Sequence, residues 1–126
     1  MASRRRRAQK SEERPPTIED VRTLALSLPR ANEALVRNRV KFRVGRIVFL
    51  AFSHDEQIMG FGFPKEERTA IVEVDPRFVL PRPSDLRYNW LCVQLDRLSP
   101  VEMRELVTDA WRMAVPKIVA VEHLGS

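Results

Sequence analysis

The segment from Arg39 to Val44 alternates basic and apolar residues without exception, as Arg-Val-Lys-Phe-Arg-Val. Because successive side chains of a β-strand point to opposite faces, this period of two predicts a strand with one apolar and one basic face. Gly45-Arg46 is a tight-turn signal, and further strands are expected over 47–52 and 57–63. The pattern therefore predicts an antiparallel meander of three strands whose apolar side faces the core.

Two segments outside the meander carry the signals of helix starts. Thr17 with Asp20 three residues later, and Ser99 with Glu102, form capping-box patterns, and each precedes apolar residues at helical spacing. The sequence therefore predicts one helix that begins after Thr17 and ends by Pro29, and another that begins after Ser99.

The region between the meander and the last helix gives weaker signals. Residues 65–73 fit a short helix, although the alternation over 71–74 is also compatible with a strand. Residues 78–80 and 90–95 are expected to be strands, because both are apolar runs bounded by breaking or polar residues. The order α-β-β-β-α-β-β-α predicts an α+β domain over residues 17–126, in which a mainly antiparallel sheet packs against helices in two layers.

The formal net charge of +5 is unevenly placed along the chain. Residues 1–16 hold six bases and two acids, and so carry four of the five units. This segment has no aromatic or β-branched residue and ends in Pro15-Pro16, so we expect an arginine-rich, disordered N-terminal tail. The folded domain is then nearly neutral, and its net charge alone does not imply a polyanionic partner.

The distribution of charge within the domain is more informative. Residues 34–54 contain five bases and no acid, whereas residues 55–75 contain six acids. Bases at alternate strand positions leave the same face about 6.8 Å apart, and like charges along a strand are unfavourable unless an acid lies opposite. Two interpretations are open: the acids of 55–75 are intramolecular partners, or the partner is a polyanion such as a nucleic-acid backbone.

On the second interpretation the basic strand face and its ends contact phosphates, and the tail adds sequence-independent contacts. The candidate nucleic-acid-binding residues are Arg37, Arg39, Lys41, Arg43 and Arg46, together with Arg4, Arg5, Arg6 and Arg7.

The residues that carry chemistry are sparse. The two histidines, His54 and His123, lie far apart, and one cysteine cannot form a Cys-based metal site, so no metal, cofactor or catalytic residue is expected and the chain is predicted not to be an enzyme. Cys92 lies in an apolar strand, which predicts an inert, buried thiol. A lone cysteine and the absence of a membrane-length apolar run favour a cytoplasmic protein with no membrane partner.

Aromatic residues stack on unpaired bases, so their positions bear on nucleic-acid binding. Trp90 and Trp111 both occur in stretches expected to pack in the core. Tyr88, beside Arg87 in a loop, is the better stacking candidate.

Several short motifs occur in a characteristic order from residue 17 to residue 124. They are Val21-Arg22, Leu26-Ser27-Leu28-Pro29, Val40–Arg46, Pro64–Arg68, Asp75–Phe78, Tyr88–Leu91, Asp109–Arg112 and Pro116-Lys117. In this order the chain resembles the MmcQ/YjbR family.

The resemblance implies a compact α+β domain with the element order given above, and a DNA-binding protein without assigned catalytic residues. The arginine-rich tail lies outside the match. We therefore expect a DNA-binding, or more broadly nucleic-acid-binding, protein that contacts phosphates. The alternative is a non-catalytic protein-interaction module, whose partner is another protein or a second copy of the chain.

Overall fold

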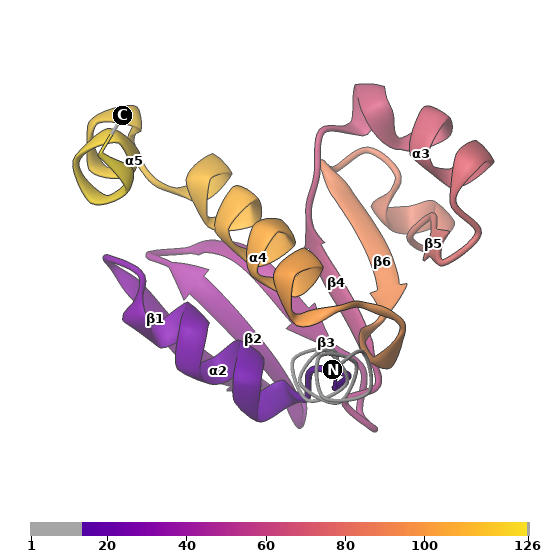
Figure 1. The fold of residues 1–126 in the computed structure, drawn as a ribbon, viewed down its shortest axis with the longest axis horizontal. Coiled ribbons are helices and arrows are strands. Elements are labelled where there is room, and N and C mark those ends of the chain that lie inside the picture. The colour runs from indigo at the N-terminus through magenta and orange to yellow at the C-terminus, as the bar shows by residue number, and fades with distance from the viewer. Residues whose placement is uncertain (1–13, 126) are drawn as a thin grey trace, which may run out of the picture.

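The computed structural model describes residues 14–125. Its six strands form one antiparallel sheet in the order β1-β2-β3-β4-β6-β5 (Figure 1). The strands are β1 (Ala31–Val36), β2 (Arg39–Val44), β3 (Ile47–Phe52), β4 (Ile58–Gly62), β5 (Phe78–Val79) and β6 (Trp90–Gln94). The α-helices of this region are α2 (Ile18–Ser27), α3 (Arg68–Val74), α4 (Pro100–Ala114) and α5 (Lys117–Leu124). Short 3-10 turns lie at η1 (Lys65–Glu67), η2 (Pro83–Asp85) and η3 (Leu95–Arg97).

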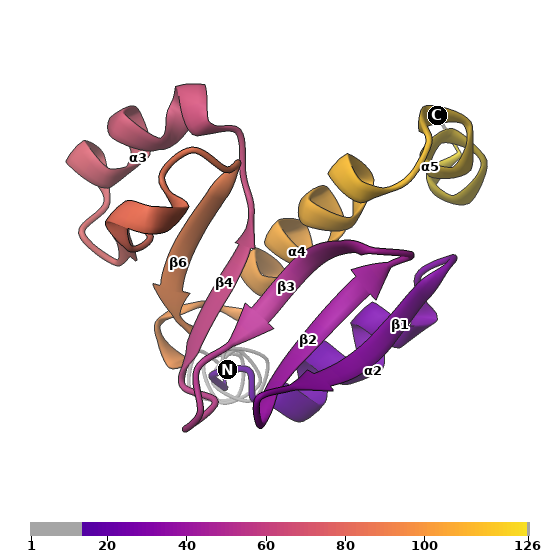
Figure 2. The same cartoon turned by 180° about the vertical axis from the view of Figure 1, so that it is seen from behind.

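Helices α2 and α4 lie side by side on one face of the sheet, and no helix among residues 14–125 covers the other face of β2, β3 and β4 (Figures 1 and 2). Both helices begin with the predicted capping boxes. The backbone N–H of Thr17 donates to the Asp20 carboxylate at 2.8 Å, and that of Ser99 donates to Glu102 at 2.9 Å. The predicted α+β class, with helices packed against a mainly antiparallel sheet, is confirmed.

The core lies between the sheet and these two helices. Its largest side chains are Phe42, Phe49, Phe52, Phe61 and Trp111, all essentially inaccessible to solvent. Burial of each phenylalanine contributes about 2–3 kcal/mol of hydrophobic free energy. A bulge in the β2–β3 pairing, between Phe42 and Arg43 on β2, allows both Phe49 and Leu50 to be buried.

The predicted meander is confirmed, but the predicted order of elements is one strand short. The sequence indicated no strand before Arg39, yet β1 pairs with β2 along its whole length. The segment Ala-Asn-Glu-Ala-Leu-Val lacks the alternation of apolar and polar residues, because β1 is an edge strand that leaves Leu35 68% exposed. Arg37 and Asn38 link the two strands with φ of 53° and 65°, as in a type I′ hairpin turn.

The second half of the domain follows the prediction more closely. Residues 68–74 form a helix rather than a strand, and the short strands over 78–79 and 90–94 are present. No helix among residues 14–125 is long and apolar enough to cross a membrane.

Most of the predicted N-terminal tail, including Arg4, Arg5, Arg6 and Arg7, lies outside the described residues. Its last residues are described: Pro16 is buried, and the Arg14 guanidinium lies 3.4 Å from the carboxylate of Asp20.

Candidate nucleic-acid interface

The basic ladder, which we define as Arg39, Lys41 and Arg43, occupies the open face of the sheet. Burial alternates along β2, with Val40, Phe42 and Val44 buried toward the helices and the three bases partly exposed on the other side. The period of two in the sequence therefore predicted the faces of this strand correctly.

No acidic side chain stands beside the ladder on the neighbouring strands. Lys41 lies between Ala34 and Ala51, and Arg43 pairs with Asn32 on β1 and with Val48 on β3. The cross-strand positions that could neutralise like charges are thus occupied by small, amide or apolar side chains.

Within residues 14–125, no ion pair forms at 4.0 Å or less to any member of the ladder or to Arg37 or Arg46. The acids of 55–75 that make close contacts use other partners: Asp55 accepts from Ser53 and Gln57, and Asp75 binds Arg77. The interpretation in which the acids of 55–75 pair with these five bases is therefore wrong for the described part of the chain.

His54 and Arg37 connect the end of the ladder to the adjacent turn. The Nε2 atom of His54 lies 3.1 Å from the Arg37 carbonyl oxygen and 3.4 Å from Nε of Arg39. This arrangement holds the two neighbouring turns together, which is a structural role.

A groove of about 820 Å³ runs along the open face beside the ladder. Three small residues from adjacent strands, Ala51, Gly60 and Cys92, lie along it and are register partners in the sheet. Arg39, Lys41 and Arg46 line the side formed by β2 and its turn. The opposite side is formed by Trp90 and by the segment before it, through Pro81, Arg82, Asp85, Tyr88 and Asn89.

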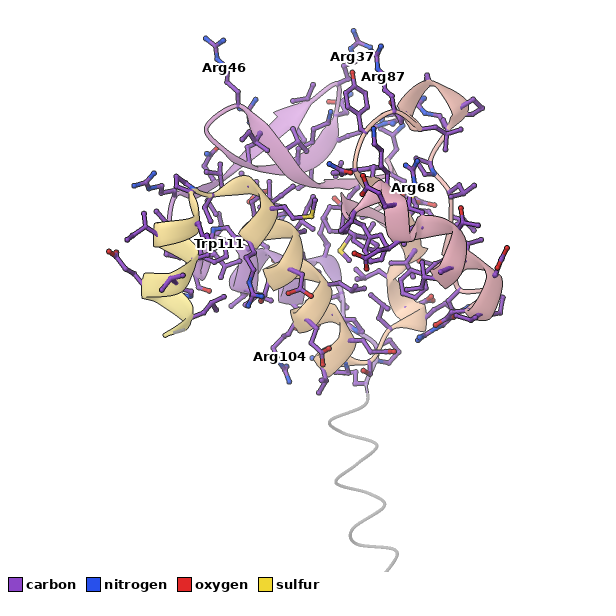
Figure 3. All side chains as sticks on the ribbon, turned by 90° about the horizontal axis from the view of Figure 1, so that it is seen from above. Arg37, Arg46, Arg68, Arg87, Arg104 and Trp111 are labelled. Carbon is purple, nitrogen blue, oxygen red and sulfur yellow. The ribbon has the colours of Figure 1, made fainter. Side chains whose placement is uncertain are left out.

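The charge that lines this groove is predominantly positive. Four basic side chains and one carboxylate line the groove. The carboxylate belongs to Asp85, and its Oδ2 atom lies 3.6 Å from Nε of Arg82. Arg39, Lys41 and Arg46 remain without an acidic partner among the described residues. Figure 3 shows that Arg37, Arg46 and Arg87 project from one side of the molecule, whereas Arg104 of α4 projects from the opposite side.

The two tryptophans, both expected in the core, lie on different faces of the sheet. Trp111 is fully buried, and its indole N–H donates to the Pro29 carbonyl oxygen at 2.8 Å, as expected of a core residue. For Trp90 the expectation was wrong: in β6 it is Leu91 and Val93 that face the core, so Trp90 is half-buried on the open face and lines the groove. Because β6 is apolar on both faces, its sequence did not indicate which residues point inward.

Cys92 shares the face of Trp90 and is only partly buried, so it is less enclosed than the sequence suggested. Burial and the nearby Asp85 carboxylate raise the pKa of its thiol. The sulfur is therefore protonated at neutral pH and a poor nucleophile, in agreement with the predicted inert thiol.

Tyr88 stands at the rim of the groove, 51% exposed. The Arg87 guanidinium lies 4.9 Å from the centre of its ring and donates to its hydroxyl at 2.8 Å. The ring is exposed, so stacking of a nucleobase on Tyr88 stays a prediction.

Arg68, which the sequence analysis did not single out, fixes the segment that carries Tyr88 and Trp90. Its guanidinium is buried and donates to the carbonyl oxygens of Leu86 at 2.7 Å, Tyr88 at 2.9 Å and Trp90 at 3.3 Å. A buried arginine without a carboxylate partner has no sequence signature beyond its place in the Pro64–Arg68 motif.

Asn89 ties the same segment to the chain that leaves β4. Its backbone oxygen accepts from the N–H of Phe63 at 3.1 Å, and its side-chain oxygen accepts from the N–H of Lys65 at 3.0 Å. Arg68 and Asn89 together hold one side of the groove in place.

Nowhere in residues 14–125 do three potential metal-ligating side chains cluster.

Comparisons with known proteins identify the fold and the family of the chain. A solved structure, Deinococcus radiodurans protein DR2400 with a DUF419 domain, superposes with a TM-score of 0.71 at 16% sequence identity, covering 90% of this chain and 91% of that one. At this identity the likeness shows the fold alone. Among curated proteins, none matches the sequence. The family model described as YjbR matches residues 26–113, which include the ladder, the groove and most of α4. The chain therefore belongs to the YjbR family.

Proposed function

We propose that this protein binds nucleic acid, and DNA in particular, through the open face of its sheet. The observation that carries the proposal is a row of three basic residues on one strand face that has no acidic partner among residues 14–125, and two of the three, Arg39 and Lys41, border a groove. Phosphates supply the missing negative charge, and the release of their counterions supplies much of the binding free energy.

The cost of keeping the ladder unpaired supports an external partner. Two unit charges about 6.8 Å apart repel by about 0.6 kcal/mol in water, and by more beside a protein surface. Lys41 has such a neighbour on each side along β2. A bound polyanion offsets this repulsion, because each basic side chain then contacts a phosphate.

Salt dependence of binding tests the proposal. If Arg37, Arg46 and the ladder each contact a phosphate, the log–log slope of affinity against salt is about −4 to −5 for duplex DNA and about −3.5 for a single strand. The triple variant Arg39→Gln, Lys41→Gln, Arg43→Gln should weaken binding strongly at 50 mM salt and reduce the slope by about two to three units.

The matched control removes the same charge from the helical side of the molecule, as Arg104→Gln, Arg112→Gln, Lys117→Gln, all exposed residues. It should bind nearly as the parent protein does. Equal losses in the two triple variants would show that net charge, and not the ladder, attracts the nucleic acid. An unchanged affinity in the ladder variant would refute the proposal.

One observation favours the alternative of a protein-interaction module. Strand β1 ends the sheet, so one of its edges has no partner strand within the described residues, and Leu35 on it is largely exposed. Unpaired edges of this kind bind a further strand, for instance from a second copy of the chain. A stable dimer in solution that Leu35→Glu dissociates, together with no nucleic-acid binding at 50 mM salt, would favour this alternative.

A further inference from the structure

We propose that the groove binds single-stranded nucleic acid and not a duplex; this inference rests on the proposed function. In the complex an unpaired nucleobase lies against Trp90, and the phosphates lie along the ladder. The proposal combines three features of the open face: a partly accessible indole, small residues beside it, and, on the β2 side, basic side chains without an acidic partner among residues 14–125.

Trp90 pairs with Gly62 of β4, and its indole lies over Gly60, two residues along the same strand. A Cβ atom added to Gly60 would stand 2.6 Å from Nε1 of the indole and 2.9 Å from both Cε2 and Cζ2, closer than Cβ atoms approach other atoms in proteins. The glycine therefore creates the space that the indole occupies. Since Trp90 is only partly buried and lines the groove, part of its ring is accessible to a ligand.

The groove beside the indole is hollow because its strands carry small side chains there. Ala51, Gly60 and Cys92 lie side by side on β3, β4 and β6, in register. The indole lies over Gly60, so Ala51 on β3 is the small residue between the indole and the basic side formed by Arg39, Lys41 and Arg46. A volume of about 820 Å³ is within the range of pockets that enclose small organic ligands.

A single-stranded nucleic acid matches both sides of this groove. An unpaired nucleotide offers a charged phosphate at one end and an apolar aromatic face at the other. In a duplex the base faces are stacked on one another and are not available to an aromatic ring inside a hollow. The ladder alone would suit either form, so it is Trp90 that discriminates between them.

The remaining polar groups on the Trp90 side can form hydrogen bonds with the edge of a nucleobase. Arg82 and Asp85 supply donors and acceptors next to the indole, and Tyr88 offers a second exposed ring at the rim. Arg68 and Asn89 hold this side in place from behind, so little ordering of the protein is required when a ligand enters.

The experiment measures binding by fluorescence anisotropy at 50 mM salt. It compares a fluorescein-labelled 12-nucleotide single-stranded DNA of mixed sequence with the duplex DNA formed from the same strand. Three proteins are measured: the full chain, Trp90→Leu, which removes the aromatic ring but keeps an apolar side chain, and Trp90→Phe, which keeps a smaller ring. Because Trp90 is a surface-groove residue, both variants should fold, and thermal melting verifies this.

The full chain should bind the single strand more tightly than the duplex. Trp90→Leu should weaken single-strand binding about 5- to 150-fold, the range for one base–aromatic stack, with Trp90→Phe between the two. Duplex binding and the salt slope should be the same in all three proteins. Addition of the single strand should also quench the tryptophan fluorescence of the full chain, and should quench that of Trp90→Phe much less, because buried Trp111 is the remaining fluorophore.

Failure of this inference is distinguishable from failure of the proposed function. If the full chain binds duplex as tightly as the single strand, or if Trp90→Leu keeps full single-strand affinity, the groove does not hold a base, whereas nucleic-acid binding through the ladder stands. If neither nucleic acid binds at 50 mM salt, the proposed function and this inference both fall.

Discussion

Replacement of Arg68 by methionine should loosen one side of the groove without touching the charges that face it. Methionine fills a similar volume but offers no donor, so the carbonyl oxygens of Leu86, Tyr88 and Trp90 lose the guanidinium. The variant therefore separates the placement of the Trp90 side from the electrostatics of the ladder.

The structure sets the size of the effect. Hydrogen bonds from a charged donor contribute roughly 1.5–3 kcal/mol each, but residues 86 and 88 are exposed, so water replaces part of what their carbonyls lose. We expect a loss of about 2–4 kcal/mol in the free energy of unfolding, which corresponds to a fall in Tm of roughly 8–15 °C for a domain of this size. Arg68→Lys should lie between, because one ammonium cannot reach three separated carbonyls.

Three measurements check the reasoning: thermal melting, hydrogen–deuterium exchange over residues 86–90, and single-strand affinity over a salt series. Exchange in the segment should become faster, and affinity should fall with an unchanged salt slope, because no phosphate contact is lost. Arg104→Met, an exposed change on α4, is the control and should alter stability by no more than about 0.5 kcal/mol. Unchanged exchange over 86–90, or a slope that drops by a full unit, would refute the positioning role of Arg68.

Three further changes have distinct signatures. Gly60→Ala should displace the Trp90 indole at a cost of about 1 kcal/mol in stability, and should lower single-strand affinity more than duplex affinity, as anisotropy would show. Glu102→Gln should destabilise the domain by about 1–2 kcal/mol above pH 5, because Arg77 holds the pKa of Glu102 at about 2. The effect is no larger because the Glu102 side chain is 39% exposed, so solvent screens its ion pair with Arg77. Since the folded pKa lies below the unfolded value, that difference should shrink as the pH falls from about 4.5 to 2 in urea unfolding curves. Deletion of residues 1–13 removes five bases and two acids, and should weaken binding and flatten the salt slope with Tm unchanged, since every described contact is retained; a large fall in Tm would contradict this.

Much of this fold could be predicted because most of its elements carry local signals. The alternation of β2 fixes its faces, and the boxes at Thr17 and Ser99 mark the starts of α2 and α4. Strand β1 was missed because an edge strand with two largely exposed faces needs no alternating pattern. It is defined by its pairing with β2, which is information that the segment itself does not contain.

The candidate site divides in the same way. The ladder follows from one strand alone, so a period of two was enough to find it. The other side of the groove depends on three relations that no local pattern encodes: which face of β6 is buried, which strand lies next to it, and which carbonyls a distant arginine reaches. For that reason Trp90 was expected in the core and Arg68 was not singled out.

The strand order explains how these parts become one surface. In the sheet β4 lies next to β6, with β5 at the edge, so the Trp90 indole is brought over Gly60 although thirty positions separate the two residues in sequence. Glycine in the interior of a strand weakens it, because it has no side chain to pack. Here the glycine in the centre of β4 makes room for an indole, and the alanine and cysteine beside it on β3 and β6 keep the hollow open. A larger side chain at Ala51 would fill the space between the ladder and Trp90, and one at Gly60 would collide with the indole. The ladder would then remain a charged strand face that suits any phosphate backbone, so the capacity to distinguish an unpaired base from a duplex resides in these small residues as much as in the tryptophan.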